Sequence, residues 1–208
     1  MKKILVVVDM QNDFVKGSLG GEKAQAIIPN VVEKINQYKN GIIFITRDIH
    51  YDNYSDTLEG KKLPVPHCLY NTKGKEVVSE VWDAAQVVRK SSGKNKVQVI
   101  DKHTFGSEHL ADILQTICKP DDVIELCGVC TDICVVSNAL LLRAALPNNI
   151  IKVDASCCAG TDKKNHNAAL LTMKNCQIDV YTGADVTKKV VKKNYTNKAT
   201  SDTKCVEE

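Results

Sequence analysis

The chain has 208 residues, of which 43% are hydrophobic and 25% charged. This length suits one domain with a substantial core, and the composition is ordinary for a globular protein. The net charge of +3 and the few aromatic residues argue against nucleic-acid binding, and no apolar stretch is long enough for a bilayer. The N-terminal apolar run carries Asp9 and Asp13, so it predicts a strand rather than a secretion signal. We expect one domain over residues 1–196, a polar tail over 197–208, and a cytoplasmic protein without nucleic-acid or membrane partners.

Nine cysteines are many for this length, but their number is odd and their spacing irregular. Cys127 and Cys130 form the pattern C-x-x-C, yet no second pair completes a zinc knuckle. Most of these thiols are therefore expected to be small buried residues in a reducing compartment.

Short apolar runs alternate with helical stretches along the chain. Strands are predicted at residues 4–8, 42–45, 97–100, 123–126, 150–153 and 178–181. Helices are predicted at residues 24–38, 108–117, 132–145, 163–173 and 184–191. The runs are almost continuously apolar, which is typical of strands covered on both faces. The pattern predicts an α/β fold: a doubly wound, mainly parallel six-stranded sheet with helices on both faces, forming a three-layer sandwich.

Residues 50–96 contain no clear strand and are rich in Asp, Asn, Lys, Gly and Pro. A loop region of that length inside a compact domain is usually functional. We therefore expect this region to contribute to a site.

Three chemically unusual residues follow predicted strands: Asp9, Lys102 and Cys134. Taken singly, the acid could cap a turn, the lysine could lie on the surface, and the cysteine could be a buried structural thiol. Thr131 or Asp132 could cap the helix that contains Cys134, and a thiol in a first helical turn is favoured as thiolate.

Taken together, these three residues form a constellation for acyl transfer, because the carboxyl ends of parallel strands meet at one edge of the sheet. Cys134 would be the nucleophile and Asp9 the base that takes its proton. Lys102 would supply a positive charge, and backbone N–H groups at the helix start would hold an oxyanion.

The segments VVVDMQNDF, IDKHTFGS and GVCTDICVVSNAL resemble the isochorismatase-like cysteine hydrolases in order and spacing, over about residues 1–183. The resemblance implies a catalytic triad of Asp9, Lys102 and Cys134. It also implies a non-proline cis peptide between Val129 and Cys130, with the N–H groups of Cys130 and Cys134 as oxyanion donors.

A second constellation lies along the region that follows the second strand. Asp48 and His50 flank one residue, so both can face one side of an extended segment, and Glu59 and His67 come later. Two carboxylates and two imidazoles suit one divalent ion, with zinc first and iron or manganese as alternatives. A polar loop without metal is the competing interpretation.

This arrangement resembles the nicotinamidase (pyrazinamidase) branch of the family, in which a metal beside the triad binds the pyridine nitrogen. On that resemblance Asp48, His50, Glu59 and His67 are the protein ligands. Many members have a third histidine where this chain has residues 51–54, and Glu59 suits the variant that uses a later glutamate. Asp52 and Asp56 remain rivals for that ligand.

The resemblance implies hydrolysis of nicotinamide to nicotinate and ammonia through a thioester on Cys134, and a homo-oligomer is a family expectation. This chain has Leu63 and Pro64 where the family often has an aromatic residue. Substrate contacts are therefore assigned to Phe14, Leu63 and Phe105. Two alternatives stay open: a metal-free relative that acts on another amide, ureido or carbamoyl compound, and a non-catalytic redox-sensing or binding protein. An isochorismate-type vinyl-ether hydrolase is disfavoured, because such members lack the nucleophilic cysteine.

Overall fold

The computed structural model of the chain describes residues 1–93 and 96–183. The helix predicted at 184–191, the domain boundary at 196 and the tail at 197–208 lie outside the described residues. Within the described ranges, no helix is both long and apolar enough to cross a membrane.

Six strands form one sheet in the order β3-β2-β1-β4-β5-β6, and every neighbouring pair is parallel. The strands are β1 (Lys3–Val8), β2 (Ile42–Asp48), β3 (Val97–Lys102), β4 (Val123–Val129), β5 (Ile150–Ala159) and β6 (Asp179–Tyr181). The central strand β1 is fully buried from Ile4 to Val8, because helices cover both of its faces. The predicted doubly wound α/β fold is confirmed.

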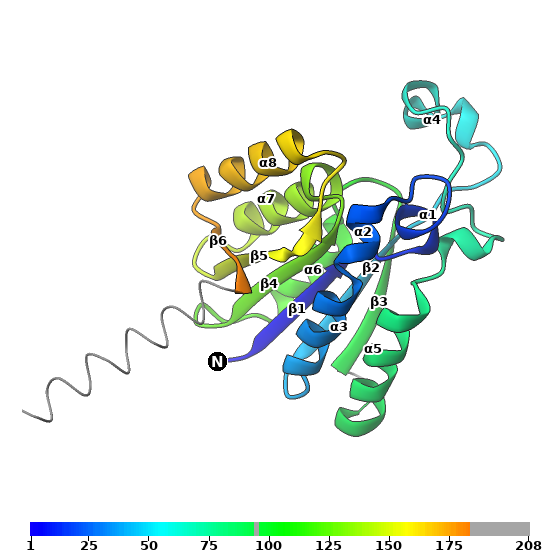
Figure 1. Cartoon of the computed structure of the whole chain (residues 1–208). Coiled ribbons are helices and arrows are strands. Elements are labelled where there is room, and N and C mark those ends of the chain that lie inside the picture. The colour runs from blue at the N-terminus through cyan, green and yellow to red at the C-terminus, as the bar shows by residue number, and fades with distance from the viewer. Residues whose placement is uncertain (94–95, 184–208) are drawn as a thin grey trace, which may run out of the picture.

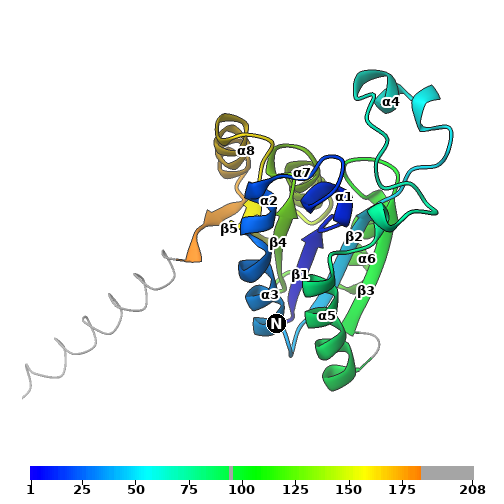
Figure 2. The ribbon, with the colours of Figure 1, turned by 45° about the vertical axis from the view of Figure 1, so that its right-hand side comes forward.

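The helices are α1 (Asn12–Val15), α2 (Glu22–Ala26), α3 (Ile28–Gln37), α4 (Leu58–Lys62), α5 (Ser79–Ser92), α6 (Glu108–Ile117), α7 (Val136–Ala145) and α8 (Lys163–Asn175). Short 3-10 turns are η1 (Tyr54–Asp56) and η2 (Lys73–Lys75), and η4 (Thr131–Val135) is a π-helical turn. Figures 1 and 2 show α3 and α5 on one face of the sheet and α6, α7 and α8 on the other. In both views α4 stands out beyond the edge of the sheet.

Two predicted helices differ from the structure. The helix predicted over 24–38 is divided into α2 and α3 at Ile27, next to Pro29 in the first turn of α3. Proline has no N–H to continue the hydrogen bonding of the preceding turn, so it favours a new helix start. The helix predicted over 132–145 begins instead with the π-helical turn η4, and α7 follows from Val136.

The prediction that residues 50–96 are mainly loop is wrong for the second half of that region, which forms α5. Val81, Ala84, Ala85 and Val88 are buried, and their helical spacing turns one face of α5 inward to pack beside α3. The first half is irregular, with η1, α4 and η2 as its only helical turns. This irregular part carries three of the predicted metal ligands.

Candidate active site

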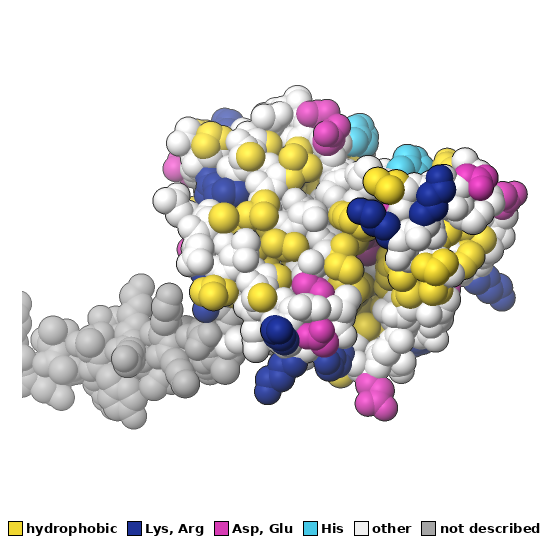
Figure 3. Space-filling model, turned by 90° about the horizontal axis from the view of Figure 1, so that it is seen from above, with side chains coloured by type: hydrophobic (Ala, Val, Ile, Leu, Met, Phe, Trp, Pro, Cys, Tyr) yellow, Lys and Arg dark blue, Asp and Glu magenta, His cyan; other side chains and the backbone are white. Residues whose placement is uncertain are grey.

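A cavity of about 560 Å³ opens at the carboxyl edge of the sheet. It lies beside the ends of β1 and β4, where the strand order reverses direction and ligands bind in doubly wound sheets. Its wall includes Phe14, Asp48, Glu59, Leu63, His67, Phe105, Val129, Cys130 and Cys134. Viewed from above, this face shows apolar side chains in its middle and charged side chains toward its rim (Figure 3). All three predicted substrate contacts line this cavity, with Phe14 buried and Leu63 and Phe105 partly exposed.

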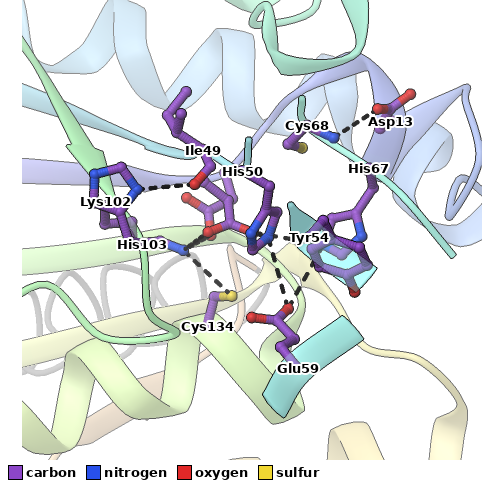
Figure 4. Close-up of polar contacts among 12 residues, drawn as sticks. Asp13, Ile49, His50, Tyr54, Glu59, His67, Cys68, Lys102, His103 and Cys134 are labelled. Carbon is purple, nitrogen blue, oxygen red and sulfur yellow. Dashed lines mark hydrogen bonds and ion pairs between the residues drawn. The ribbon is translucent and has the colours of Figure 1, made fainter. Parts of the chain in front are cut away.

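The three residues of the predicted triad meet beside this cavity, and Cys134 is the one that lines its wall. Lys102 Nζ lies 2.7 Å from Asp9 Oδ2 and 3.7 Å from Cys134 Sγ. All three side chains are buried, and the long lysine side chain reaches from β3 past β2 to the end of β1. Figure 4 shows Lys102 directed toward Cys134.

Burial governs the electrostatics of this trio. Burial raises the pKa of the Asp9 carboxyl above its usual range, although the charge of Lys102 opposes the rise. Burial and the nearby Asp9 carboxylate raise the pKa of the Cys134 thiol well above its usual value, and Lys102 only partly offsets this. These surroundings favour the protonated thiol, whereas a helix N-terminus by itself favours the thiolate. A base must therefore take the proton of the Cys134 thiol when the sulfur attacks a substrate.

The backbone at the end of β1 gives Asp9 an unusual direction. Asp9 has a φ of 49°, in the left-handed region that few residues other than glycine adopt. Its Oδ1 accepts a hydrogen bond of 2.7 Å from Thr46 Oγ1, which leaves Oδ2 to face Lys102. Such uncommon conformations cluster at functional sites. Thr46 is a contributor that sequence reasoning missed, since nothing in its pattern distinguishes it from other strand residues.

The turn that carries Cys134 begins at a cis peptide between Val129 and Cys130, the bond that the family resemblance implies. The carbonyl of Cys130 accepts hydrogen bonds from the N–H groups of Ile133 and Val135. The prediction that Thr131 or Asp132 caps this helix is wrong. Because α8 packs against this turn, both side chains bind residues in or before that helix instead.

A second polar group lies at the same cavity, and three of its four members line the wall. The ligand atoms of Asp48, His50, Glu59 and His67 all lie within 4.8 Å of one another. The carboxylate Oδ2 of Asp48 is 2.9 Å from His50 Nε2 and 3.6 Å from His67 Nε2. The carboxylate Oε1 of Glu59 is 3.7 Å from each of the same two nitrogens. Figure 4 shows Glu59, on α4, facing the two imidazole rings.

The chemistry of this donor set suits a divalent ion. His67 Nδ1 lies 2.8 Å from the carbonyl oxygen of Val65, and donation of the Nδ1 proton to that oxygen would make the Nε2 lone pair available to a metal ion. Two imidazoles and two carboxylates match zinc, iron or manganese. Asp52 and Asp56, the rivals of Glu59, are exposed and lie outside the group.

Asp48 joins the donor group to the catalytic trio. It pairs in register with Lys102 across β2 and β3, and its Oδ1 lies 3.4 Å from Lys102 Nζ while Oδ2 faces the histidines. Burial would raise the pKa of the Asp48 carboxyl, but hydrogen bonds from His50 and His67 and the charge of Lys102 bring it below its usual range. Asp48 is therefore a carboxylate at neutral pH.

Tyr54 is a further residue that sequence reasoning missed. Its ring meets those of His50 and His67 nearly edge-on, with centroids 4.7 Å and 5.2 Å away, and its hydroxyl donates to the carbonyl of Leu63. It lies in the stretch 51–54, where the family resemblance places a third histidine. A buried tyrosine thus packs against the two imidazoles from the stretch in which the family resemblance suggests a third histidine ligand.

Comparison with known proteins agrees with this geometry. The sequence pattern of the isochorismatase domain matches residues 3–185. The chain is 28% identical to the nicotinamidase of Saccharomyces cerevisiae over 180 residues, covering 66% of this chain and 80% of that protein.

Two solved structures share the fold over most of the chain. A pyrazinamidase/nicotinamidase from Streptococcus mutans superposes with a TM-score of 0.74 at 27% identity, covering 86% of this chain and 100% of that one. The pyrazinamidase of Pyrococcus horikoshii in complex with zinc superposes with a TM-score of 0.70 at 26% identity, covering 88% and 99%.

Proposed function

Because this chain belongs to the isochorismatase family, we propose that it hydrolyses nicotinamide to nicotinate and ammonia in a metal-dependent reaction. Its likeness to nicotinamidases identifies it as an amidohydrolase of that branch. The observation that carries the proposal is one cavity whose wall includes both Cys134 and three members of the four-residue donor group. The trio of Asp9, Lys102 and Cys134 adjoins that group through the contact of Lys102 with Asp48.

The first half of the proposed reaction forms a thioester. Asp9 takes the proton of the Cys134 thiol, and the sulfur attacks the amide carbon of the substrate. Backbone N–H groups of Cys130 and Cys134 donate to the oxyanion of the tetrahedral intermediate. Lys102 compensates the negative charge that passes between the carboxylate and the sulfur. Asp9 returns the proton to the amine, so ammonia leaves and the acyl group stays on Cys134.

The second half releases the acid. Asp9, again a carboxylate, takes a proton from a water molecule, and the hydroxide oxygen attacks the thioester carbon. The carbon–sulfur bond breaks, nicotinate forms, and Cys134 recovers its proton. Asp9 is buried beside Lys102 and Cys134, so the same carboxylate serves as the base in each half of the reaction.

The aromatic ring of the substrate would lie against Phe14, with Leu63 and Phe105 at the cavity rim. Phe14 lies 5.3 Å from His67 between ring centroids, so its ring flanks the four-residue donor group. When bound there, a divalent ion supplies a Lewis-acid anchor for the pyridine nitrogen; zinc is proposed first, with iron or manganese as alternatives. We further propose a single domain in the cytoplasm, in keeping with the free thiols of the described cysteines, and a homo-oligomer on the family resemblance.

Ammonia release from nicotinamide tests the proposal directly. We expect the purified protein to release ammonia, to lose this activity after chelation, and to regain it with zinc. A metal-free relative acting on another amide would differ, since chelation would leave its activity intact. No release of ammonia from the zinc-loaded protein would contradict nicotinamide as the substrate.

The choice of Glu59 as a ligand gives a second prediction. We expect Glu59→Gln to weaken zinc binding by about 10-fold or more, because loss of a ligand costs at least as much as loss of a supporting residue. Competition with a fluorescent zinc chelator measures this affinity. Asp52→Asn and Asp56→Asn are matched controls with the same loss of charge, and both should bind zinc like the unmodified protein. If Asp52→Asn or Asp56→Asn weakened zinc binding and Glu59→Gln did not, that aspartate rather than Glu59 would be the metal ligand.

A further inference from the structure

Two polar side chains between Asp9 and Phe14 are directed into the protein. Gln11 is fully buried, and Asp13 is partly buried and bound to a backbone N–H. Neither contacts the triad or supplies a metal-ligand atom in the group described above. Burying polar side chains is unfavourable unless each is hydrogen-bonded, so their partners indicate what these residues do.

The side-chain amide of Gln11 binds both the backbone N–H and the backbone carbonyl of the ligand Asp48. Gln11 Oε1 accepts from the Asp48 N–H at 2.7 Å, and Gln11 Nε2 donates to the Asp48 carbonyl at 2.8 Å. The second proton of Nε2 goes to the Lys75 carbonyl at 2.9 Å. One side chain therefore fixes the end of β2 and ties it to the turn η2.

Asp13 binds the other ligand-bearing segment. Its Oδ2 accepts from the N–H of Cys68 at 2.8 Å, directly after the ligand His67 (Figure 4). Gly74 packs on the same carboxylate, and a Cβ there would lie only 1.9 Å from Asp13 Oδ2. The carboxylate is therefore enclosed by the irregular part of the chain that carries the metal-binding side chains.

We propose that Gln11 and Asp13 are positioning residues that set the geometry of the metal site from the segment after β1, which also carries the catalytic base. This inference rests on the proposed function, because it requires that the group of Asp48, His50, Glu59 and His67 binds a metal. The paired register of β1 with β2 ends at Val7 and Ile45, so the side chain of Gln11 supplies hydrogen-bond partners to Asp48 beyond the last paired residue of β1. The segment after β1 thus acts on the ligand Asp48, 37 residues from Gln11, and on Cys68 beside the ligand His67, 55 residues from Asp13.

The expected consequence is on metal affinity. Ligand atoms must lie in a favourable arrangement before the ion binds, and supporting hydrogen bonds hold them there. Loss of such a partner typically weakens metal binding by about 10- to 100-fold. We expect Gln11→Ala and Asp13→Ala to show a loss of this size for zinc in competition with a fluorescent chelator.

Two further variants sharpen the test. Asp13→Asn keeps an oxygen that can accept from the Cys68 N–H, so it should restore zinc affinity to within a few-fold of the unmodified protein. Asn12→Ala is the matched control: Asn12 lies between the two residues and bonds the Lys73 carbonyl, without contact to a residue that is or adjoins a ligand. It should bind zinc normally.

The outcomes are separable. A purely structural role would lower the thermal stability of the metal-free variants and leave their zinc affinity unchanged, which would overturn the inference alone. If Gln11→Ala does not fold, the comparison of Asp13→Ala with Asp13→Asn decides the same question. No zinc binding by the unmodified protein would overturn both the inference and the metal dependence. Zinc binding without nicotinamide hydrolysis would overturn only the proposed reaction.

Discussion

Replacing Cys134 by alanine is expected to reduce nicotinamide turnover by about 10⁴-fold or more, because no thioester can form without the sulfur. Zinc binding should be unchanged, since Cys134 lies outside the four-residue donor group. Ammonia release and chelator competition on the same sample separate these two effects. In the unmodified protein, rapid acid quenching followed by mass spectrometry should detect an acyl adduct on the peptide that contains Cys134.

The control for this prediction is Cys176→Ala, which removes an exposed thiol at the end of α8. This variant should retain full activity. Substantial ammonia release by Cys134→Ala would refute covalent catalysis and leave only chemistry that needs no thiol. In an alkylation experiment we expect one reactive thiol, that of Cys134, whose modification abolishes activity. If two thiols reacted as a pair instead, the redox-sensing alternative would be favoured.

The second large effect is expected on stability. Lys34 of α3 is buried between two carboxylates, 2.7 Å from Glu125 of β4 and 2.8 Å from Asp154 of β5. The hydroxyls of Tyr38 and Tyr181 donate to Glu125 at 2.7 Å and 2.6 Å. One lysine thus joins a helix to two strands through a hydrogen-bonded group in which Lys34, Glu125 and Asp154 are buried.

Lys34→Met should lower the free energy of unfolding by about 3–5 kcal/mol, because it leaves two buried carboxylates without a cation. Burial alone would lower the pKa of Lys34, but hydrogen bonds to Asp154, Glu125 and Tyr181 raise it above its usual value. A raised lysine pKa means that this stabilisation is present at neutral pH and is lost only at pH values above the usual lysine range. Urea unfolding at pH 7 measures the effect.

Lys16→Met provides a matched control, because Lys16 pairs with Glu80 at 2.7 Å on the surface, with both side chains 45% exposed. Exposed ion pairs contribute about 0–1 kcal/mol, so this variant should unfold almost like the unmodified protein. Equal effects of the two substitutions would show that the buried group contributes no more than a surface pair.

The sequence by itself determined the strands, the fold class and the residues at the strand ends. Parallel strands buried on both faces require nearly continuous apolar runs, and such runs are visible locally. Polar residues that follow them, such as Asp9 and Cys134, stand out because the topology brings strand ends to one edge. The apolar spacing of α5 is also present in the sequence, but the polar composition of the surrounding region led to the prediction of a loop.

Only the tertiary structure decided which distant residues meet. It placed Glu59 rather than Asp52 or Asp56 beside the two histidines, because the irregular segment that contains α4 turns that side chain toward the two imidazole rings. It also brought Lys34 to Glu125 and Asp154, and Gln11 to the backbone of Asp48. The physical reason is that burial and pairing depend on chain segments far apart in the sequence. Cys134 shows this best, since its local helix start favours a thiolate whereas burial in the folded protein raises the pKa of its thiol.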